Sequence, residues 1–214
     1  FSVMPISIWR PELDYENSDY TIISTWEANF QNSSQLRFEM FNRYVKLYDE
    51  FDPTRTDNAI PLPSDQNYYY TSFEVSFRSD QRKKVFYRIN PSVGQFFNGN
   101  KYSLESSLSL RLQPYFSGSI QMNYDKIDLP DPYPDASIWL IGPKFDITFT
   151  KNMFWSTFFQ YSTQRENFSI NTRFQWRVAP LSDLFLVYND NYSTTVFSPR
   201  FRSLNLKFTY WLNI

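Results

Sequence analysis

Two residue types that carry much of protein chemistry are missing from this chain of 214 residues. There is no cysteine, which excludes disulfides, thiolate metal sites and a cysteine nucleophile. There is also no histidine, so the commonest general base and the commonest metal ligand are absent. Most hydrolase and metalloenzyme sites are thereby excluded, and we expect neither a cofactor nor enzymatic activity.

Long apolar runs and an excess of charge are missing as well. No segment approaches the roughly 18 consecutive apolar residues that a transmembrane helix needs. The 21 basic residues nearly balance 22 acidic ones, so no net positive field attracts nucleic acid, and we do not expect it as a partner. The mean hydropathy of −0.51 is typical of a soluble protein. It is equally compatible with a membrane barrel, in which every second residue faces a polar interior.

Aromatic residues are abundant, at 21% of the chain, whereas glycine occurs only 4 times. Tyrosine and phenylalanine favour β-strands, and they concentrate where a protein crosses a membrane interface. The composition therefore favours an all-β protein with a membrane-facing surface.

Apolar and polar residues alternate with a period of two, which places each kind on one face of a strand. The alternation is clearest in residues 101–112, 167–178 and 203–214. In the first of these the apolar positions are Tyr102, Leu104, Leu108, Leu110 and Leu112. Turn signals between such segments predict about twelve strands, long enough for tilted membrane strands. Their predicted ranges are 3–14, 20–30, 35–48, 67–79, 84–97, 101–112, 115–127, 137–150, 153–163, 166–178, 183–191 and 201–214.

The predicted connections differ in length from one side to the other. The three longest, 49–66, 128–136 and 192–200, follow the third, seventh and eleventh strands and so emerge on one side. Outer-membrane barrels have long extracellular loops and short periplasmic turns. The end of the chain, LKFTYWLNI, stops at the apolar Ile214 and is similar to the C-terminal assembly signal of such barrels. We therefore predict an antiparallel transmembrane β-barrel.

Four segments carry a resemblance to a known family: FDPTRTDNAIPLP, SFRSDQRKK, FTKNMFWSTFFQYSTQRENFSINTRFQWRVAPLSDLFLVYND and LNLKFTYWLNI. From about Phe51 onward the chain resembles an uncharacterised bacterial outer-membrane family. In that family a carbohydrate-binding-module (family 9-like) domain precedes a C-terminal barrel. The resemblance implies that residues 1–214 are the C-terminal part of a longer protein. The family has glycine in the turn before DLFLVYN, where this chain has Leu181.

Charged residues on the predicted polar faces are the candidate lumen-lining residues. They are Arg37, Glu39, Lys101, Glu105, Arg111, Arg173, Arg177 and Lys207, with Arg43 beside them. Such residues either set the selectivity of a pore or form a paired, water-filled interior without passage. Both alternatives stay open at the level of the sequence.

Two acidic loops and a set of aromatic residues are further candidates. The loops carry Asp49, Glu50, Asp52 and Asp57, and Asp128, Asp131 and Asp135. They are either solvated turns or a calcium site, although the order of an EF-hand is absent. Near the outer loops lie Tyr68, Tyr69, Tyr70, Trp139, Tyr192 and Phe197. We interpret these as an interface girdle, with glycan stacking as the alternative.

The expected function is that of an integral barrel in the bacterial outer membrane. It would anchor or cooperate with the missing carbohydrate-binding domain, as part of an uptake or secretion assembly. The expected partners are the lipid bilayer, other outer-membrane proteins and, through that domain, a glycan. Three rivals remain: a passive pore for small solutes, a soluble carbohydrate-binding β-sandwich, and an enzyme that uses Asp131 or Asp135.

Overall fold

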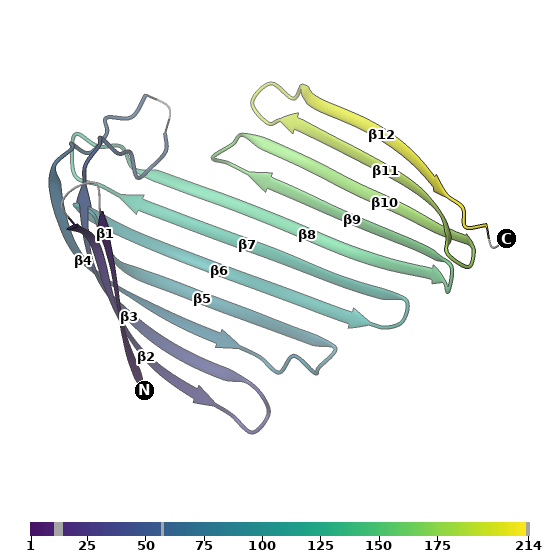
Figure 1. The fold of residues 1–214 in the computed structure, drawn as a ribbon, viewed down its shortest axis with the longest axis horizontal. Helices are drawn as coiled ribbons and strands as arrows, with labels where there is room; N and C mark the ends of the chain where they lie inside the picture. The colour runs from purple at the N-terminus through teal and green to yellow at the C-terminus, as the bar shows by residue number, and fades with distance from the viewer. Residues whose placement is uncertain (11–14, 57, 213–214) are drawn as a thin grey trace. The chain divides into compact units, whose positions relative to one another are not determined.

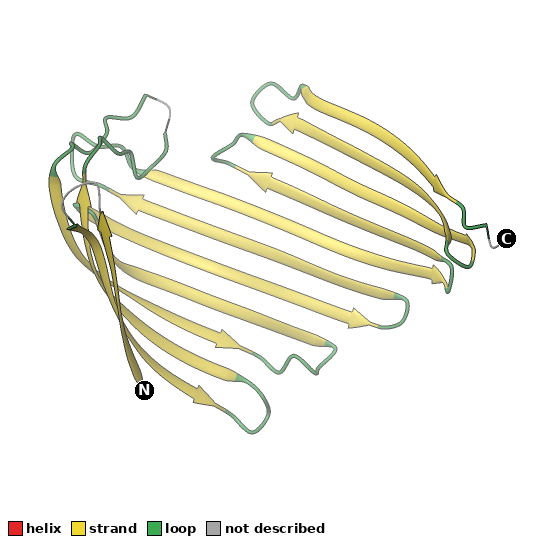
Figure 2. Ribbon diagram, viewed as in Figure 1, coloured by secondary structure: helices red, strands yellow, loops and turns green. Residues whose placement is uncertain are grey.

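Twelve β-strands make up the fold in the computed structural model, which describes residues 1–10, 15–56 and 58–212 (Figures 1 and 2). Those residues contain no helix, and hence none that is able to cross a membrane. The strands are β1 (Ser2–Arg10), β2 (Glu16–Asn29), β3 (Gln35–Leu47), β4 (Gln66–Arg78), β5 (Val85–Phe96), β6 (Gly99–Leu112), β7 (Phe116–Asp128), β8 (Ala136–Thr150), β9 (Met153–Ser162), β10 (Asn167–Ala179), β11 (Ser182–Ser193) and β12 (Pro199–Thr209).

All twelve strands belong to one sheet, in which each strand is hydrogen-bonded to its neighbours in sequence. The pairing is antiparallel from β1 to β5 and from β8 to β12. The order begins at β1 and ends at β12, so each has one hydrogen-bonded neighbour among the described residues. The all-β antiparallel prediction is confirmed, whereas closure into a barrel stays a prediction.

The predicted strands agree with the observed ones to within two residues at each described end, apart from two larger differences. β2 starts at Glu16, earlier than predicted, and β12 ends at Thr209. The amide of Trp211 donates to the Ser182 hydroxyl (3.0 Å), which takes this residue away from the strand ladder. Residues 11–14 of the first predicted strand and the terminal Ile214 lie outside the described residues.

The turn between β10 and β11 contains the residue that departs from the family pattern. Leu181 has a φ of 58°, in the left-handed region that favours glycine. Its side chain is exposed, so no packing offsets the strain. The backbone at this turn therefore favours glycine over leucine, and the resemblance itself stays a prediction.

The strands divide into two compact units, which we describe separately. Unit 1 comprises Phe1–Gln81, Arg88–Ser106 and Asn123–Ile138. Unit 2 comprises Arg82–Tyr87, Ser107–Met122 and Trp139–Ile214. Four strands are shared, because each of β5 to β8 has one end in each unit.

Buried apolar side chains are few and lie in unit 1 alone among the described residues. They are Leu62, Tyr70, Ile127 and Leu129. Leu62, in the loop after β3, exchanges backbone hydrogen bonds with Phe51 (2.8 and 3.1 Å). Phe51 packs on Phe97 of the β5–β6 turn, with ring centroids 5.4 Å apart. This small core packs the loop after β3 against the ends of the strands.

Most large apolar side chains are exposed instead. The most exposed among the strand residues are Leu206 at 70%, and Leu204 and Tyr69 at 67% each. On β2, β4 and β10, Trp26, Phe73 and Trp176 are between 40% and 48% exposed. The protein therefore shows an apolar sheet face that the described chain does not cover.

Candidate functional site on the polar face

The register of the strands places the predicted polar side chains on one face of each unit. In unit 1, Glu27 is opposite Arg37, and Arg37 is opposite Ser76. Because directly opposite residues share a face, the polar positions of β2, β3 and β4 form continuous rows. The alternation predicted from the sequence is thus confirmed for these strands.

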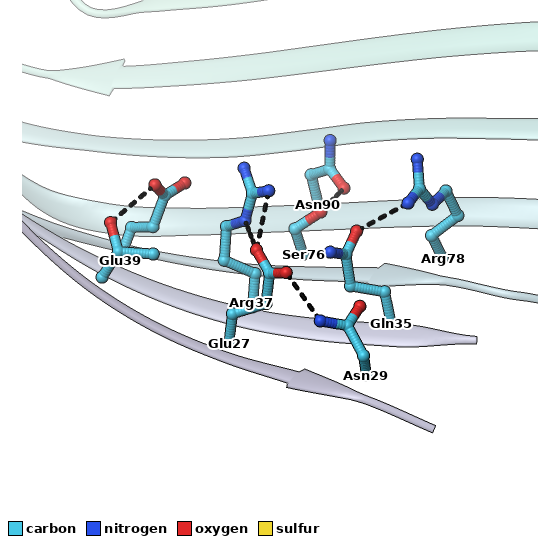
Figure 3. A network of polar contacts seen from close by, with 9 residues as sticks. Glu27, Asn29, Gln35, Arg37, Glu39, Ser76, Arg78 and Asn90 are labelled. Carbon is cyan, nitrogen blue, oxygen red and sulfur yellow. Dashed lines mark hydrogen bonds and ion pairs between the residues drawn. The ribbon is translucent and has the colours of Figure 1, made fainter. Parts of the chain in front are cut away.

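Hydrogen bonds connect these rows from one strand to the next, as Figure 3 shows. Arg37 donates to Oε2 of Glu27 through Nε (3.1 Å) and Nη2 (2.9 Å). Thr25 donates to Oε1 of Glu39 at 3.1 Å, and Arg78 donates to Oε1 of Gln35 at 2.8 Å. In this part of unit 1, the polar side chains are hydrogen-bonded to one another, as expected for an interior filled by paired side chains.

Further along the polar face of unit 1 lies a hollow of about 310 Å³. Its residues come from β3 to β6 and include three aromatic rings and several small polar side chains. They are Phe41, Arg43, Tyr70, Ser72, Glu74, Ser92, Val93, Gly94, Gln95, Phe96, Lys101 and Ser103. The lining combines two cations and one carboxylate.

Gly94 in this lining marks a close approach between β4 and β5. A Cβ at this position would lie 2.3 Å from the Cα of Ser72, a distance that forces the backbone to move. Glycine therefore permits the close approach of the two strands.

Lys101 and Arg43 have different partners within the hollow. The ammonium of Lys101 lies 3.2 Å from Oδ1 of Asp125, a carboxylate that also accepts from Ser103 at 2.5 Å. Arg43 donates to the Ser72 hydroxyl (2.9 Å) and lies 4.5 Å from the centroid of the Phe41 ring. No carboxylate among the described residues forms an ion pair with Arg43.

Acidic residues face one another in the neighbouring row of unit 1. Glu39 is directly opposite Glu74 in the register of β3 and β4. Like charges in such positions destabilise a sheet unless other groups compensate them. Arg37 and Arg43 lie on the same face, and Glu39 accepts a hydrogen bond from Thr25. Glu105 adds a third carboxylate nearby, without an ion pair among the described residues.

In unit 2 the polar face holds a second hollow, of about 320 Å³. It is lined by Asp146, Ile147, Thr148, Phe154, Trp155, Ser156, Arg173, Gln175 and Arg177. Asp146 is already bonded to Ser156 (2.5 Å), Ser117 (3.5 Å) and Lys144 (3.4 Å). The cations Arg173 and Arg177 therefore dominate this hollow.

The remaining charges of unit 2 are only partly compensated. Arg177 lies 3.6 Å from Oδ1 of Asp183, which also accepts from Gln175 at 3.0 Å. Arg173 and Lys207 form no ion pair within the described residues. Arg111 lies with its guanidinium 4.4 Å from the centroid of the Phe86 ring. This polar face carries more cations than carboxylates.

The eight candidate residues are thus divided between two surfaces. Those in unit 1 are Arg37, Glu39, Lys101 and Glu105, and those in unit 2 are Arg111, Arg173, Arg177 and Lys207. Their placement on polar faces agrees with the predicted alternation. Whether they line a water-filled pore stays a prediction.

Carboxylates in the acidic loops hold their own loops in shape. Asp52 accepts from the amides of Thr54 (2.8 Å) and Thr56 (2.9 Å), and Asp135 accepts from the amide of Leu129 (3.0 Å). No group of three acidic side chains in the described chain is arranged around a metal position. The loop interpretation explains Asp52 and Asp135, whereas Asp57 lies outside the described residues.

The tyrosines grouped as an interface girdle divide between the two faces. Tyr69 continues an aromatic row with Tyr44 (4.7 Å between centroids), which stacks on Tyr20 (5.3 Å), on the apolar face. Tyr68 and Tyr70 point to the other face, where both pack on Phe97. They belong to the small core beneath the loop, because neighbouring strand residues alternate.

A cluster of charged residues lies next to the aromatic row in unit 1, at the end of β1, the start of β2 and the end of β3. Lys46 lies 2.5 Å from Oε1 of Glu16, and the Tyr48 hydroxyl donates to Oε2 of Glu16 at 3.1 Å. Arg10 lies over the Tyr48 ring, 4.5 Å from its centroid. Burial and the hydrogen bond to Glu16 raise the pKa of Tyr48.

Several residues of these surfaces were missed by the sequence analysis. Glu74, Asp125 and Asp146 lie on the polar face, like the charged residues that were selected. The alternation of polar and apolar residues along their strands could have identified them. Asp190 and Arg202 belong to the apolar parity and carry opposite charges on neighbouring strands. Two opposite charges at positions that the alternation assigns to the apolar face could have identified this pair.

Comparison with protein-family models, with curated proteins and with solved structures finds no match to this chain.

Proposed function

We propose that this chain is the membrane-spanning part of a bacterial outer-membrane protein, with its apolar sheet face in lipid and its polar face toward water. The main support is the exposed apolar face of the sheet. Only four large apolar side chains are buried in the described residues, although 42% of the chain is hydrophobic. Lipid would remove that surface from water, at about 25 cal/mol per Å².

A closed sheet would also satisfy the backbone, because unpaired amides and carbonyls are costly in hydrocarbon. β1 and β12 therefore each need a further partner strand in the membrane. The resemblance supports a longer protein in which a carbohydrate-binding-module (family 9-like) domain comes before the barrel. The proposed role is to anchor or cooperate with that domain, alongside other outer-membrane proteins.

A passive pore is the second candidate, and the hollow of unit 2 favours it. Arg173, which lines this hollow without an ion pair in the described chain, is suited to attract small anions. The bonded rows of unit 1 favour a filled interior instead. Conductance in planar bilayers separates the two, since an anchor gives no current and a pore gives stepwise current.

Membrane fractionation tests the proposal itself. The full-length protein should remain in the outer-membrane fraction after a carbonate wash and should require detergent for release. Its folded form should migrate differently from its boiled form on a gel. A soluble β-sandwich would appear in the supernatant without detergent, and that result would overturn the proposal.

A further inference from the structure

An ion pair lies on the apolar face of unit 2, near the end of β11 and the start of β12. The polar face and its proposed function give it no role. Arg202 donates from Nε to Oδ2 of Asp190 at 2.9 Å. Asp190 is opposite Arg202 in the register, and Tyr188 is opposite Leu204. These residues thus continue the apolar row of Leu204 and Leu206 rather than the polar row.

The two charges of this pair differ strongly in exposure. The Asp190 side chain is 1% exposed, and its Oδ1 atom has no hydrogen-bond partner in the structure. The Arg202 side chain is 52% exposed. Tyr188 donates to the same carboxylate oxygen, and Arg202 donates to the Tyr192 hydroxyl and lies over its ring. A buried carboxylate and two half-buried tyrosines therefore hold an arginine that remains open to its surroundings.

The neighbouring loops add cations and an apolar tip. Arg200 donates to the Arg165 carbonyl and to the Ser193 hydroxyl, both at 3.4 Å, which brings two further arginines to this end of the strands. The β11–β12 loop exposes Val196 at 70% and Phe197 at 84%. An apolar tip beside arginines is typical of a segment at the boundary between headgroups and acyl chains.

We infer that Arg202, positioned by Asp190 and Tyr192, binds the phosphate of an anionic lipid headgroup. This inference rests on the proposed function, because only in a membrane does the apolar face meet lipid. Nε and one proton of Nη2 are bonded to Asp190 and Tyr192, which leaves Nη1 and the second proton of Nη2 to donate to a phosphate. Asp190 offsets the cost of this charge within the protein, and the exposed part of the guanidinium is open to a headgroup.

Unit 1 carries a related group at the loop end of its own apolar face. There Lys46 and Arg10 surround Tyr48 and Glu16, below the row of stacked tyrosines. Both groups thus combine cations, one carboxylate and tyrosines near the ends of strands. The Arg202 site differs in that its carboxylate is buried, which fixes the direction of the guanidinium.

Native mass spectrometry of the detergent-solubilised protein tests the inference, with phosphatidylglycerol and phosphatidylcholine as probes. Wild type should retain phosphatidylglycerol in preference, and Arg202→Gln should lower that preference by about tenfold. Arg202→Lys should fall between them, because it keeps the charge but loses the fork. Lys207→Gln, on the other face of the same strand, is the matched control and should leave the preference unchanged. Inorganic phosphate should not compete, since the site takes a headgroup held at the membrane.

Asp190→Asn separates a positioned site from a general positive surface. A positive surface would bind phosphatidylglycerol more tightly once Asp190 is neutralised, whereas a positioned arginine would bind it more weakly. Equal retention of the two lipids by wild type, or an unchanged preference in Arg202→Gln, would overturn the inference. If Asp190→Asn does not fold, the two Arg202 variants decide alone. Failure of the wild type to insert into vesicles of either lipid would instead overturn the proposed function.

Discussion

On the polar face of unit 1, Arg37 and Lys101 are paired with carboxylates of neighbouring strands, whereas in unit 2 Arg173 and Lys207 form no ion pair among the described residues. Arg37 is paired with Glu27, and Lys101 with Asp125. In unit 2 the carboxylate of Asp146 is bonded to other groups, and Arg173 is left open toward its hollow. One polar face therefore resembles a filled interior, and the other offers a surface for anions.

The largest expected effect concerns packing, which is tighter at Gly94 of unit 1 than at Gly142 of unit 2. We expect Gly94→Ala to destabilise the protein by about 3 kcal/mol, because the new Cβ meets the backbone of Ser72. In unit 2, Gly142→Ala should cost about 1 kcal/mol or less, since its Cβ would lie 3.3 Å from the Phe158 ring. Urea unfolding of both variants in lipid vesicles measures the difference. Equal losses would show that the two units tolerate a Cβ alike.

A smaller effect is expected from the ion pairs. Arg37→Gln should cost about 1 kcal/mol or less, because both partners are partly exposed and water screens the pair. Arg173→Gln should change stability by less than about 0.5 kcal/mol, since no carboxylate depends on it. A double-mutant cycle with Glu27→Gln checks the coupling in unit 1. A larger loss at Arg173 than at Arg37 would reverse the comparison.

The smallest effect is electrostatic, and the absence of cysteine makes it measurable. Thr148→Cys places a thiol in the hollow of unit 2, and Ser92→Cys places one in the hollow of unit 1. At each cysteine, the rate of an anionic thiol reagent is divided by the rate of a cationic one. This ratio should be about three times higher at Thr148→Cys than at Ser92→Cys, because Arg173 and Arg177 attract anions. Equal rate ratios would remove the distinction between the two hollows. No reaction at either site would favour a filled interior.

The sequence predicted the strands well because the two-residue period is a local property of the chain. Alternation along 167–178 correctly placed Arg173 and Arg177 on one face of β10. The end of β12 was less predictable, because Trp211 leaves the ladder through a contact with Ser182, a residue distant in sequence. Periodicity does not encode such a contact.

Features that depend on several strands escaped prediction. Tyr70 was grouped with Tyr69, although its parity directs it into the small core with Phe97. The need for Gly94 appears only when β4 and β5 are brought together. The pairing of Asp190 with Arg202 depends on the register between β11 and β12, which the sequence alone does not fix.

The central claim is that the two sheet faces meet different surroundings, lipid on one side and water on the other. Nitroxide labels on single cysteines along β11 test it most directly, in the protein reconstituted in vesicles. At Leu184 and Leu186 we predict high accessibility to oxygen, which dissolves in lipid, and low accessibility to a water-soluble nickel complex. At Phe185 and Val187, on the polar face, the order should be reversed. Low accessibility to both reagents at Leu184 and Leu186 would place them in a protein core and contradict a membrane-facing sheet.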